Sequence, residues 1–248
     1  MIPFDLRAVE EGITGTGFAG QITHFASVSS TNTLALEAAQ TGARCGVYVA
    51  DEQTAGRGRG GHSWHSIAGD GLYFSALVAP PIPSTMAMLL PLATGLAAQS
   101  AIAAMTGLAV DIRWPNDLLV DGRKCGGILV ESASTAGDAN GSLLRYAVIG
   151  VGINVNHQSF PAEIAALATS LRNECGHPVS REALLIGILR FLDQEIRSVV
   201  EEYRGALRGV GLLERFTAAS TWVRGKRVHV EEEGGYTGVP AGLAPRGL

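Results

Sequence analysis

Short apolar runs and stretches with helical periodicity alternate along most of the chain. The segment QITHFASV (21–28) is strand-like, and STNTLALEAAQTG (30–42) begins with cap residues, continues as an apolar-periodic run and closes at Gly42. GVYVADEQ (46–53) has the composition of a buried strand, and another strand-like run begins at Leu72. Because strands and helices are interleaved, we predict a mixed sheet with helices packed on it, an α/β or α+β fold.

Two further strand regions follow. VDIRWPNDLLVDGRKCGGILVES (110–132) contains two apolar runs joined by Asp121-Gly122, a two-residue hairpin signal. LLRYAVIGVGINVN (143–156) reads as another central strand, separated from the hairpin by the polar loop SASTAGDANGS (132–142). These segments predict that the sheet continues through the middle of the chain.

The last third changes character twice. Beyond Ser180, apolar residues step by three and four and predict one helix whose stripe belongs to the core, namely Leu184, Ile188, Leu192, Ile196, Val199 and Tyr203. From Trp222 onward the chain has short alternating runs with Gly-Gly and Pro punctuation. We therefore predict a main domain over residues 1–222 and a small β unit over 223–248.

One stretch has the low charge of a membrane segment, because no charged residue occurs between Asp70 and Asp111. It contains four prolines and is then dominated by Ala, Ser, Thr and Gln rather than Leu and Ile, which disfavours a transmembrane span. The pattern predicts a strand LYFSALVAP (72–80), a proline turn and a buried Ala-rich helix that ends near Gly107.

Composition narrows the function classes. The 248 residues include 19 Lys and Arg against 23 Asp and Glu, a net charge of −4, which argues against general coating of nucleic acid. Three cysteines, Cys45, Cys125 and Cys175, lie far apart without Cys-x-x-Cys spacing, so we expect reduced thiols in the cytoplasm rather than a disulfide framework or a zinc site. The start, MIPFDLRAVEEG, lacks the arrangement of a secretory signal.

The segment TAGRGRGGHSW (54–64) places four glycines and two arginines in positions 56–61. Glycines let backbone approach a ligand closely, and arginines bind carboxylate or phosphate as a fork. The segment is neither a Walker A sequence nor Gly-x-Gly-x-x-Gly. By itself the pattern fits a solvated loop and an anion site equally well. Its place between two core strands, followed by Trp64, favours the anion site.

Two other segments combine glycines with polar residues at strand ends. Asn116 and Asp117 lie beside a proline turn, and Lys124 precedes Gly126-Gly127 inside a strand, where glycine often marks close approach of a ligand. A lone lysine of this kind is more often an ordinary hairpin-edge residue. VIGVGINVN (148–156) ends a buried strand with Gly and Asn, which also make ordinary turns.

Together these segments resemble the biotin protein ligase family in order and spacing. The resemblance rests on SSTN (29–32), EQTAGRGRGGHSW (52–64), RWPNDLLVDGRKCGGILVE (113–131) and VIGVGINVN (148–156), spread over about 125 residues. It implies an α+β catalytic domain, a mixed sheet flanked by helices of the class II synthetase-like type, followed by an SH3-like β unit. The expected reaction joins biotin to ATP, releases pyrophosphate, and transfers biotin from biotinyl-5′-AMP to a lysine of a biotin carboxyl carrier protein.

The resemblance also assigns roles to individual residues. Lys124 and Arg57 would be catalytic. The residues expected to bind biotin are Ser30, Thr31, Asn32, Gln53, Gly56, Arg57, Gly58, Arg59, Lys124 and Gly127. Those expected to hold ATP or the adenylate are Arg57, Arg59, Trp64, Asn116, Asp117, Lys124, Gly152 and Asn154. Mg²⁺ would accompany the phosphates, with Asp117 as the candidate metal ligand.

The chemistry requires such residues because the biotin carboxylate must approach a polyanionic triphosphate, and like charges repel strongly in a dry site. Lys124, Arg57 and Mg²⁺ would cancel that repulsion and stabilise charge on the α-phosphate. The acyl-adenylate is a mixed anhydride that water would destroy. We therefore expect residues 57–63 to be mobile without ligand and ordered over the adenylate.

The chain departs from the resemblance in three places. SSTN begins only about thirty residues in, which leaves no room for the N-terminal helix-turn-helix domain of some relatives. Gly60 and His62 stand near positions where relatives often carry further basic residues. GVPAGLAPRGL (238–248) stops where the β domain of the family would be half built, so we expect an incomplete unit with an unpaired edge.

Two alternatives belong beside the leading interpretation. A lipoate protein ligase or octanoyltransferase shares the fold and a catalytic lysine, although the GRGRGG and WPND segments resemble the biotin branch more closely. A protein that binds RNA or DNA through the Arg-Gly loop is a different class, disfavoured by the acidic net charge and the lack of a second basic cluster. We expect a carboxyl carrier protein as partner, no nucleic acid and no membrane. The sequence leaves both a monomer and a homodimer open.

Overall fold

The computed structural model describes residues 3–136, 141–230 and 235–243. Its centre is a seven-stranded sheet in the order β1-β2-β3-β7-β6-β5-β4. Strands β1 and β2 are parallel, and every other pair of neighbours is antiparallel. The strands are β1 (Ile22–Phe25), β2 (Gly46–Ala50), β3 (Gly71–Val78), β4 (Asp111–Arg113), β5 (Asp117–Val120), β6 (Arg123–Ser134) and β7 (Leu144–Asn154).

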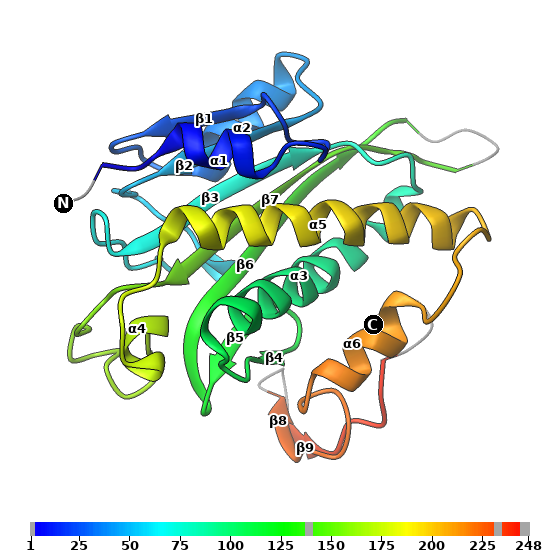
Figure 1. Cartoon of the computed structure of the whole chain (residues 1–248). Helices are drawn as coiled ribbons and strands as arrows, with labels where there is room; N and C mark the ends of the chain where they lie inside the picture. The colour runs from blue at the N-terminus through cyan, green and yellow to red at the C-terminus, as the bar shows by residue number, and fades with distance from the viewer. Residues whose placement is uncertain (1–2, 137–140, 231–234, 244–248) are drawn as a thin grey trace.

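Helices cover both faces of this sheet. Figure 1 shows α5 (Arg181–Tyr203) and α3 (Leu89–Thr106) crossing one face side by side. Helix α2 (Thr31–Gln40) packs on the opposite face, where Ala35 and Ala39 contact Leu77 and Val148. The predicted α+β class, a mixed sheet flanked by helices, is confirmed. Shorter helices are α1 (Leu6–Gly12), α4 (Leu171–Cys175) and α6 (Leu212–Ala219), none of which the sequence analysis identified.

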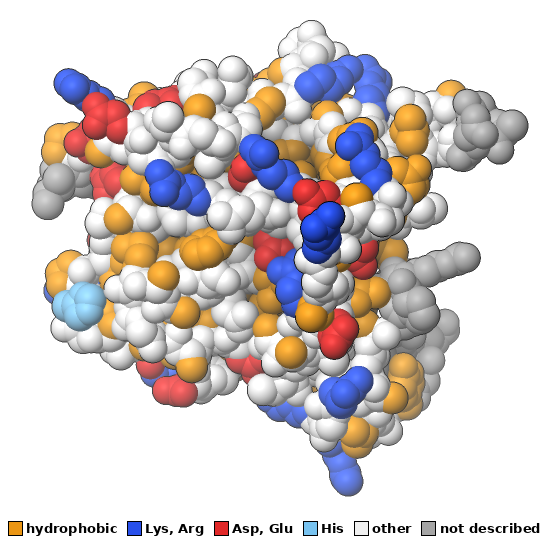
Figure 2. All heavy atoms as spheres, turned by 45° about the vertical axis from the view of Figure 1, so that its right-hand side comes forward, with side chains coloured by type: hydrophobic (Ala, Val, Ile, Leu, Met, Phe, Trp, Pro, Cys, Tyr) orange, Lys and Arg blue, Asp and Glu red, His pale blue; other side chains and the backbone are white. Residues whose placement is uncertain are grey.

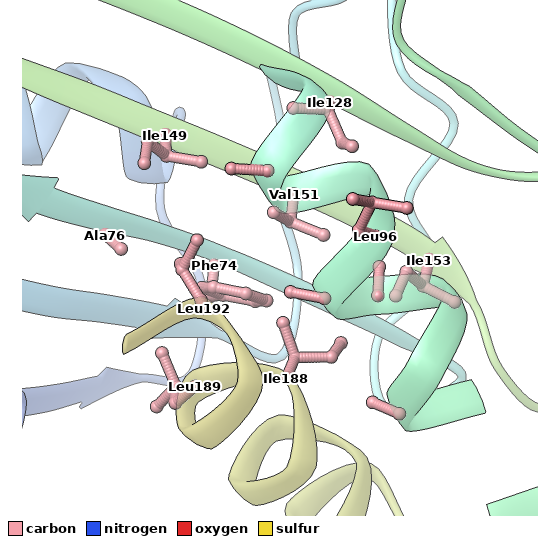
Figure 3. Close-up of a cluster of buried hydrophobic side chains, with 14 of the residues drawn as sticks. Phe74, Ala76, Leu96, Ile128, Ile149, Val151, Ile153, Ile188, Leu189 and Leu192 are labelled. Atoms are coloured by element: carbon pink, nitrogen blue, oxygen red, sulfur yellow. The ribbon is translucent and has the colours of Figure 1, made fainter. Parts of the chain in front are cut away.

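The main core lies between the sheet and the pair α3 and α5. Figure 3 shows how alternate side chains of the central strands point to this layer and meet the two helices; the labelled residues are Phe74, Ala76, Leu96, Ile128, Ile149, Val151, Ile153, Ile188, Leu189 and Leu192. All eight residues of β3 are buried because helices cover the strand on both faces. The central strands therefore read as continuous apolar runs in the sequence.

Helix α3 was the segment that required a membrane test. Ser84–Thr106 is long and apolar enough to cross a membrane by length and composition alone, but 61% of the most apolar window is buried inside the protein. Gly107 ends the helix with a φ of 71°, as the sequence predicted. Its low charge follows from its place in the core, between the sheet and α5.

Several local predictions are confirmed. Asp121 and Gly122 form the turn between β5 and β6, with φ values of 48° and 77°, the left-handed conformation that a two-residue hairpin requires. The helix predicted beyond Ser180 is α5, and its cap is Ser180, which accepts a hydrogen bond from the Ala183 amide at 3.1 Å. All three cysteines are free.

Two local predictions need correction. The polar loop predicted at 132–142 is shorter, because β6 continues to Ser134 and pairs with β7 there; residues 137–140 of that loop lie outside the described part of the chain. The predicted core stripe of α5 does not extend to Tyr203, which is 47% exposed because the last turn of the helix runs beyond the sheet.

The predicted small β unit contains a separate two-stranded sheet, β8 (Val228–Val230) and β9 (Tyr236–Gly238). The prediction that this unit is incomplete involves residues 231–234 and 244–248. These residues lie outside the described part of the chain, so the prediction stays untested. The domain boundary at residue 222 therefore stays a prediction. On the face drawn in Figure 2, basic and acidic side chains are interspersed, in keeping with a net charge of only −4.

Candidate active site

The floor of the candidate site is made by glycines that face away from the main core. Along β7, Ile149, Val151 and Ile153 point to the core, so Gly150 and Gly152 fall on the other face of the sheet. The register places Gly152 beside Gly127 of β6. Three side chains are therefore missing from one small area of the sheet, which opens a hollow over backbone.

Polar side chains at the start of α2 form one wall. Gln53 Oε1 accepts hydrogen bonds from the Thr31 amide at 2.9 Å and from Thr31 Oγ1 at 3.1 Å. Ser75 Oγ lies 2.8 Å from Thr31 Oγ1 and 2.5 Å from Asn32 Oδ1. Gly150 leaves room for this network, because a Cβ there would lie 2.1 Å from Asn32 Oδ1.

Lys124 lies at the opposite wall of the site. Lys124 Nζ is 2.6 Å from Asp117 Oδ1, and Arg113 Nε donates to Asp117 Oδ2 at 3.1 Å. Burial alone raises the pKa of Asp117, but the hydrogen bonds and charges of Lys124 and Arg113 outweigh it and hold that pKa below its ordinary value. The ionised carboxylate in turn orients the Lys124 side chain.

The glycine-rich segment folds back on itself above the floor. Arg57 and Ser63 form an antiparallel bridge, and the Gly58 amide donates to the His62 carbonyl at 2.7 Å. Gly60 and Gly61 make the turn with φ values of 64° and 80°, which side chains other than glycine rarely adopt. Gly60, one of the two departures from the family pattern in this loop, is thus the residue that suits the turn.

The two arginines of this loop reach down to β6 and to the WPND segment. Arg57 Nη2 donates to Glu131 Oε2 at 3.0 Å, and Arg59 Nη1 donates to Asn116 Oδ1 at 3.3 Å. Asn116 is itself fixed, because its Nδ2 donates to the Ile128 carbonyl at 3.0 Å. Both guanidinium groups are therefore held at the rim of the hollow.

Trp64 lies across the floor. A Cβ on Gly152 would come within 2.6 Å of Trp64 Cε2, and a Cβ on Gly127 within 3.0 Å of Trp64 Cζ3. Lys124 Nζ lies 5.5 Å from the centroid of the indole ring, in the range of a cation–π contact. Trp64 Nε1 is buried, and no hydrogen-bond partner is found for it among the described residues. The indole N–H thus faces the sheet at Gly152, where an added Cβ would lie 2.8 Å from Nε1.

These walls enclose a small cavity that is partly open to solvent. Its lining comprises Ser30, Thr31, Asn32, Gln53, Arg57, Gly58, Arg59, Trp64, Phe74, Asn116, Lys124, Gly127, Ile128, Leu129, Gly150, Val151 and Gly152. One end offers neutral hydrogen-bonding groups and the other offers cations. The arrangement suits an elongated molecule with a polar head and an anionic tail.

Most of the residues predicted for the site therefore lie together, and three lie outside the lining. Gly56 is behind the loop, where its carbonyl accepts from the Trp64 amide at 2.9 Å. Asp117 contacts the cavity only through Lys124. Asn154 is buried and donates to the Thr169 carbonyl at 3.0 Å; it lines a neighbouring hollow on the other side of Trp64 and Lys124.

Ser75, Glu131 and Gly150 also belong to this region, although no sequence pattern predicted a role for them. Ser75 is the single polar residue in the buried strand β3, which is a signal that could have identified it. Gly150 shares the two-residue period of Gly152 and was noted without a role. Glu131 closes the apolar run of β6 and gave no signal, because its partners come from distant parts of the sequence.

The described residues contain no cluster of three or more His, Cys, Asp or Glu suited to a metal ion. Both carboxylate oxygens of Asp117, the predicted metal ligand, are engaged by Lys124 and Arg113. The donor set therefore does not fit a metal held by protein ligands alone.

The chain was compared with known proteins. Residues 24–154 match the biotin/lipoate A/B protein ligase family. The chain is 35% identical over 218 residues to the bifunctional ligase/repressor BirA of Bacillus spizizenii, covering 84% of this chain but 66% of that protein. It is 32% identical over 240 residues to the biotin-[acetyl-CoA-carboxylase] ligase of Mycobacterium tuberculosis, covering 94% of this chain and 83% of the relative.

A solved structure agrees with these sequence matches. The biotin protein ligase of Aquifex aeolicus in complex with biotin and ATP superposes with a TM-score of 0.73 at 27% identity, covering 92% of this chain and 90% of the other. The similarity therefore extends well beyond the glycine-rich segment, and the shared architecture includes the strands that carry the cavity.

Proposed function

Because the chain belongs to the biotin/lipoate A/B protein ligase family, we propose that it is an ATP-dependent biotin protein ligase. In the first step a biotin carboxylate oxygen attacks the α-phosphorus of ATP, the bond to the β-phosphate breaks, and pyrophosphate leaves. In the second step a lysine amine of a carrier protein attacks the acyl carbon of biotinyl-5′-AMP. The bond to AMP breaks, and the amine proton is released.

The observation that carries this proposal is the polarity of the cavity. Thr31, Asn32 and Gln53 supply donors and acceptors at one end, and Lys124 and Arg57 supply cations at the other. A cyclic urea needs the first set, and a carboxylate beside a phosphate needs the second. Between the two ends, Trp64 and Leu129 belong to the lining and offer apolar surface that an aliphatic chain can contact.

Lys124 and Arg57 are proposed to act by charge. Lys124 is held by Asp117 at 2.6 Å, so its ammonium is already oriented before substrates arrive. Arg57 lies on the loop above the same cavity, where its guanidinium can contact the carboxylate and the α-phosphate. The two cations lower the repulsion between the anions and stabilise the charge that builds on the phosphoryl oxygens.

The remaining residues are proposed to hold the adenylate and to exclude water. Trp64 offers a flat face, and Arg59 with Asn116 closes the rim. Asn154, in the adjoining hollow, would contact the far end of the nucleotide only if that hollow is part of the same site. The acceptor is proposed to be the carrier protein or domain of a biotin-dependent carboxylase. This proposal is supported by the name of the Mycobacterium relative, which states that that protein joins biotin to acetyl-CoA carboxylase.

Exchange of labelled pyrophosphate into ATP tests the first step. We expect exchange with biotin and Mg²⁺, and none with lipoate or octanoate. Transfer of labelled biotin to a purified biotin-carrier domain tests the second step. Exchange driven by lipoate instead of biotin would assign the chain to the other branch of its family, and lack of exchange with every acid would contradict the proposal.

A further inference from the structure

Glu131 is a carboxylate at the edge of the cavity that the proposed reaction does not use. It lies on the cavity side of β6, two positions beyond Leu129 and four beyond Gly127. The side chain is 29% exposed and points under the glycine-rich loop, where it shares a hollow with residues 57–62. A negative charge next to a site for anions needs a reason, because it would repel the substrates if it were free.

The reason lies in the two hydrogen bonds that Glu131 accepts. Its Oε2 accepts one hydrogen bond from Arg57 Nη2 at 3.0 Å and another from Asn32 Nδ2 at 2.9 Å. Among the described residues no other side chain accepts a hydrogen bond from Arg57. A single oxygen thus joins the loop above the cavity to the wall below it.

The link continues into the wall. Asn32 Oδ1 lies 2.5 Å from Ser75 Oγ, which is fully buried in β3. The same amide packs directly on Gly150, where an added Cβ would lie 2.1 Å from Asn32 Oδ1. Asn32 is therefore a rigid support, so the oxygen of Glu131 is fixed in spite of its partial exposure.

Arg57 needs such a support. Its side chain is 46% exposed and rises from a loop that contains four glycines, so on its own it would sample many rotamers. Glu131 contacts only one of its terminal nitrogens, which leaves the remaining N–H groups of the fork available for a ligand anion.

We propose that Glu131 is a positioning residue of the ligase reaction, which holds Arg57 over the cavity by bridging it to Asn32. This inference rests on the proposed function, because Arg57 is taken to bind the reacting anions. Glu131 itself contacts neither substrate. Its effect on the rate is carried mainly by Arg57, with a smaller part through Asn32, which bonds to the same oxygen.

A double-mutant cycle tests this role through kcat/KM for biotin-dependent pyrophosphate exchange. Glu131→Ala should lower kcat/KM about tenfold in the otherwise unchanged chain, the effect of one charge-assisted hydrogen bond. In an Arg57→Ala background the same change should lower kcat/KM by less than about threefold, because Glu131 then has no arginine to position and only its hydrogen bond from Asn32 is lost. Equal losses in both backgrounds, or no loss in the first, would overturn the proposal.

Conservative variants of Glu131 distinguish an effect on the position of Arg57 from a loss of folding. Glu131→Gln retains an oxygen that can accept from both Asn32 and Arg57, so it should stay within about threefold of the unchanged protein. Glu131→Asp is one methylene shorter and cannot reach both partners, so it should lose activity mainly when Arg57 is present. If Glu131→Ala does not fold, these two variants supply the result, and a Gln variant as weak as the Asp variant would contradict the inference.

Glu195→Gln is the matched control, because Glu195 pairs with Arg215 between α5 and α6, far from the cavity. It should leave kcat/KM unchanged. Failure of the unchanged chain to exchange with biotin would count against the proposed function, whereas normal exchange in both it and Glu131→Ala would count against Glu131 alone.

Discussion

The chain has two lysines, Lys124 and Lys226, and they occupy contrasting environments. Lys124 lines the cavity and is paired with Asp117. Lys226 lies with its Nζ 3.3 Å from the centroid of the Trp222 ring, next to the small β8-β9 sheet. Replacing Lys124 therefore tests the role of the cavity, and replacing Lys226 is the matched control.

Lys124→Ala should reduce biotin-dependent pyrophosphate exchange at least about a hundredfold, because it removes a cation aimed at the reacting phosphate. Lys226→Ala should leave exchange unchanged. Initial rates with saturating ATP and biotin measure both. Near-normal exchange by Lys124→Ala would remove this residue from the mechanism.

The glycines of the floor are a second feature at the residue scale. Gly150→Ala should weaken biotin binding at least about tenfold, because the added Cβ would collide with the Asn32 amide and break hydrogen bonds of the wall. Isothermal titration with biotin measures this loss. Gly46→Ala is the control, since Gly46 lies in β2 outside the cavity and its added Cβ would meet only the Tyr48 side chain. Equal affinities of Gly150→Ala and the unchanged protein would contradict this account of the floor.

At the scale of elements, the glycine-rich loop is the part of the site with the least support from the core. Gly60 to Ser63 are exposed, and the turn depends on two residues with positive φ. Holding such a segment in one conformation costs roughly 1 to 2 kcal/mol of backbone entropy per residue, and glycine costs most. A ligand that contacts Arg57, Arg59 and Trp64 would supply the interactions that offset this cost.

Amide hydrogen exchange should therefore slow at least about tenfold in peptides covering 57–63 when biotin and ATP are added. The buried strand β3 provides the internal reference, because its exchange should not depend on ligand. Equal protection of the loop with and without ligands would rule out closure. That result would leave the proposed chemistry of Lys124 intact.

At the scale of the whole molecule, one buried histidine connects several elements beside the site. The fully buried His157 stacks on Phe160, and its Nε2 lies 3.3 Å from Tyr73 Oη in β3. Its carbonyl accepts a hydrogen bond from Ser170, the cap of α4, at 2.6 Å. Burial lowers the pKa of His157 to about 4, from an ordinary value of 6.5.

This lowered pKa predicts the pH dependence of stability. Between pH 6.5 and about 4 the unfolded chain binds a proton at His157 that the folded chain does not, so the free energy of unfolding falls as the pH falls through this window. The loss should reach at most about 3 kcal/mol. Urea unfolding of the unchanged protein and of His157→Gln at several pH values measures it. The variant should lose less stability across the same window, and identical slopes would contradict the prediction.

The local signals of the sequence were sufficient for most of the architecture. The Asp121-Gly122 turn and the end of α3 at Gly107 were predicted because each depends on residues within a few positions. Short helices such as α4 were missed, because a single turn has too few residues to show a period. The family resemblance added the functional interpretation that periodicity could not supply.

The sequence predicted the mixed sheet with its helices, the glycine-rich loop, and Lys124, Arg57 and Trp64, the residues that we propose carry the chemistry. It did so because periodicity, turn residues and short motifs are local properties of a chain. Only the tertiary structure decided that Asn154 belongs to a neighbouring hollow and that Asp117 is occupied by Lys124 and Arg113. It also joined Asn32 to Glu131, 99 residues away, under Arg57. Contacts of this kind depend on which faces of separate strands meet, and no local pattern encodes them.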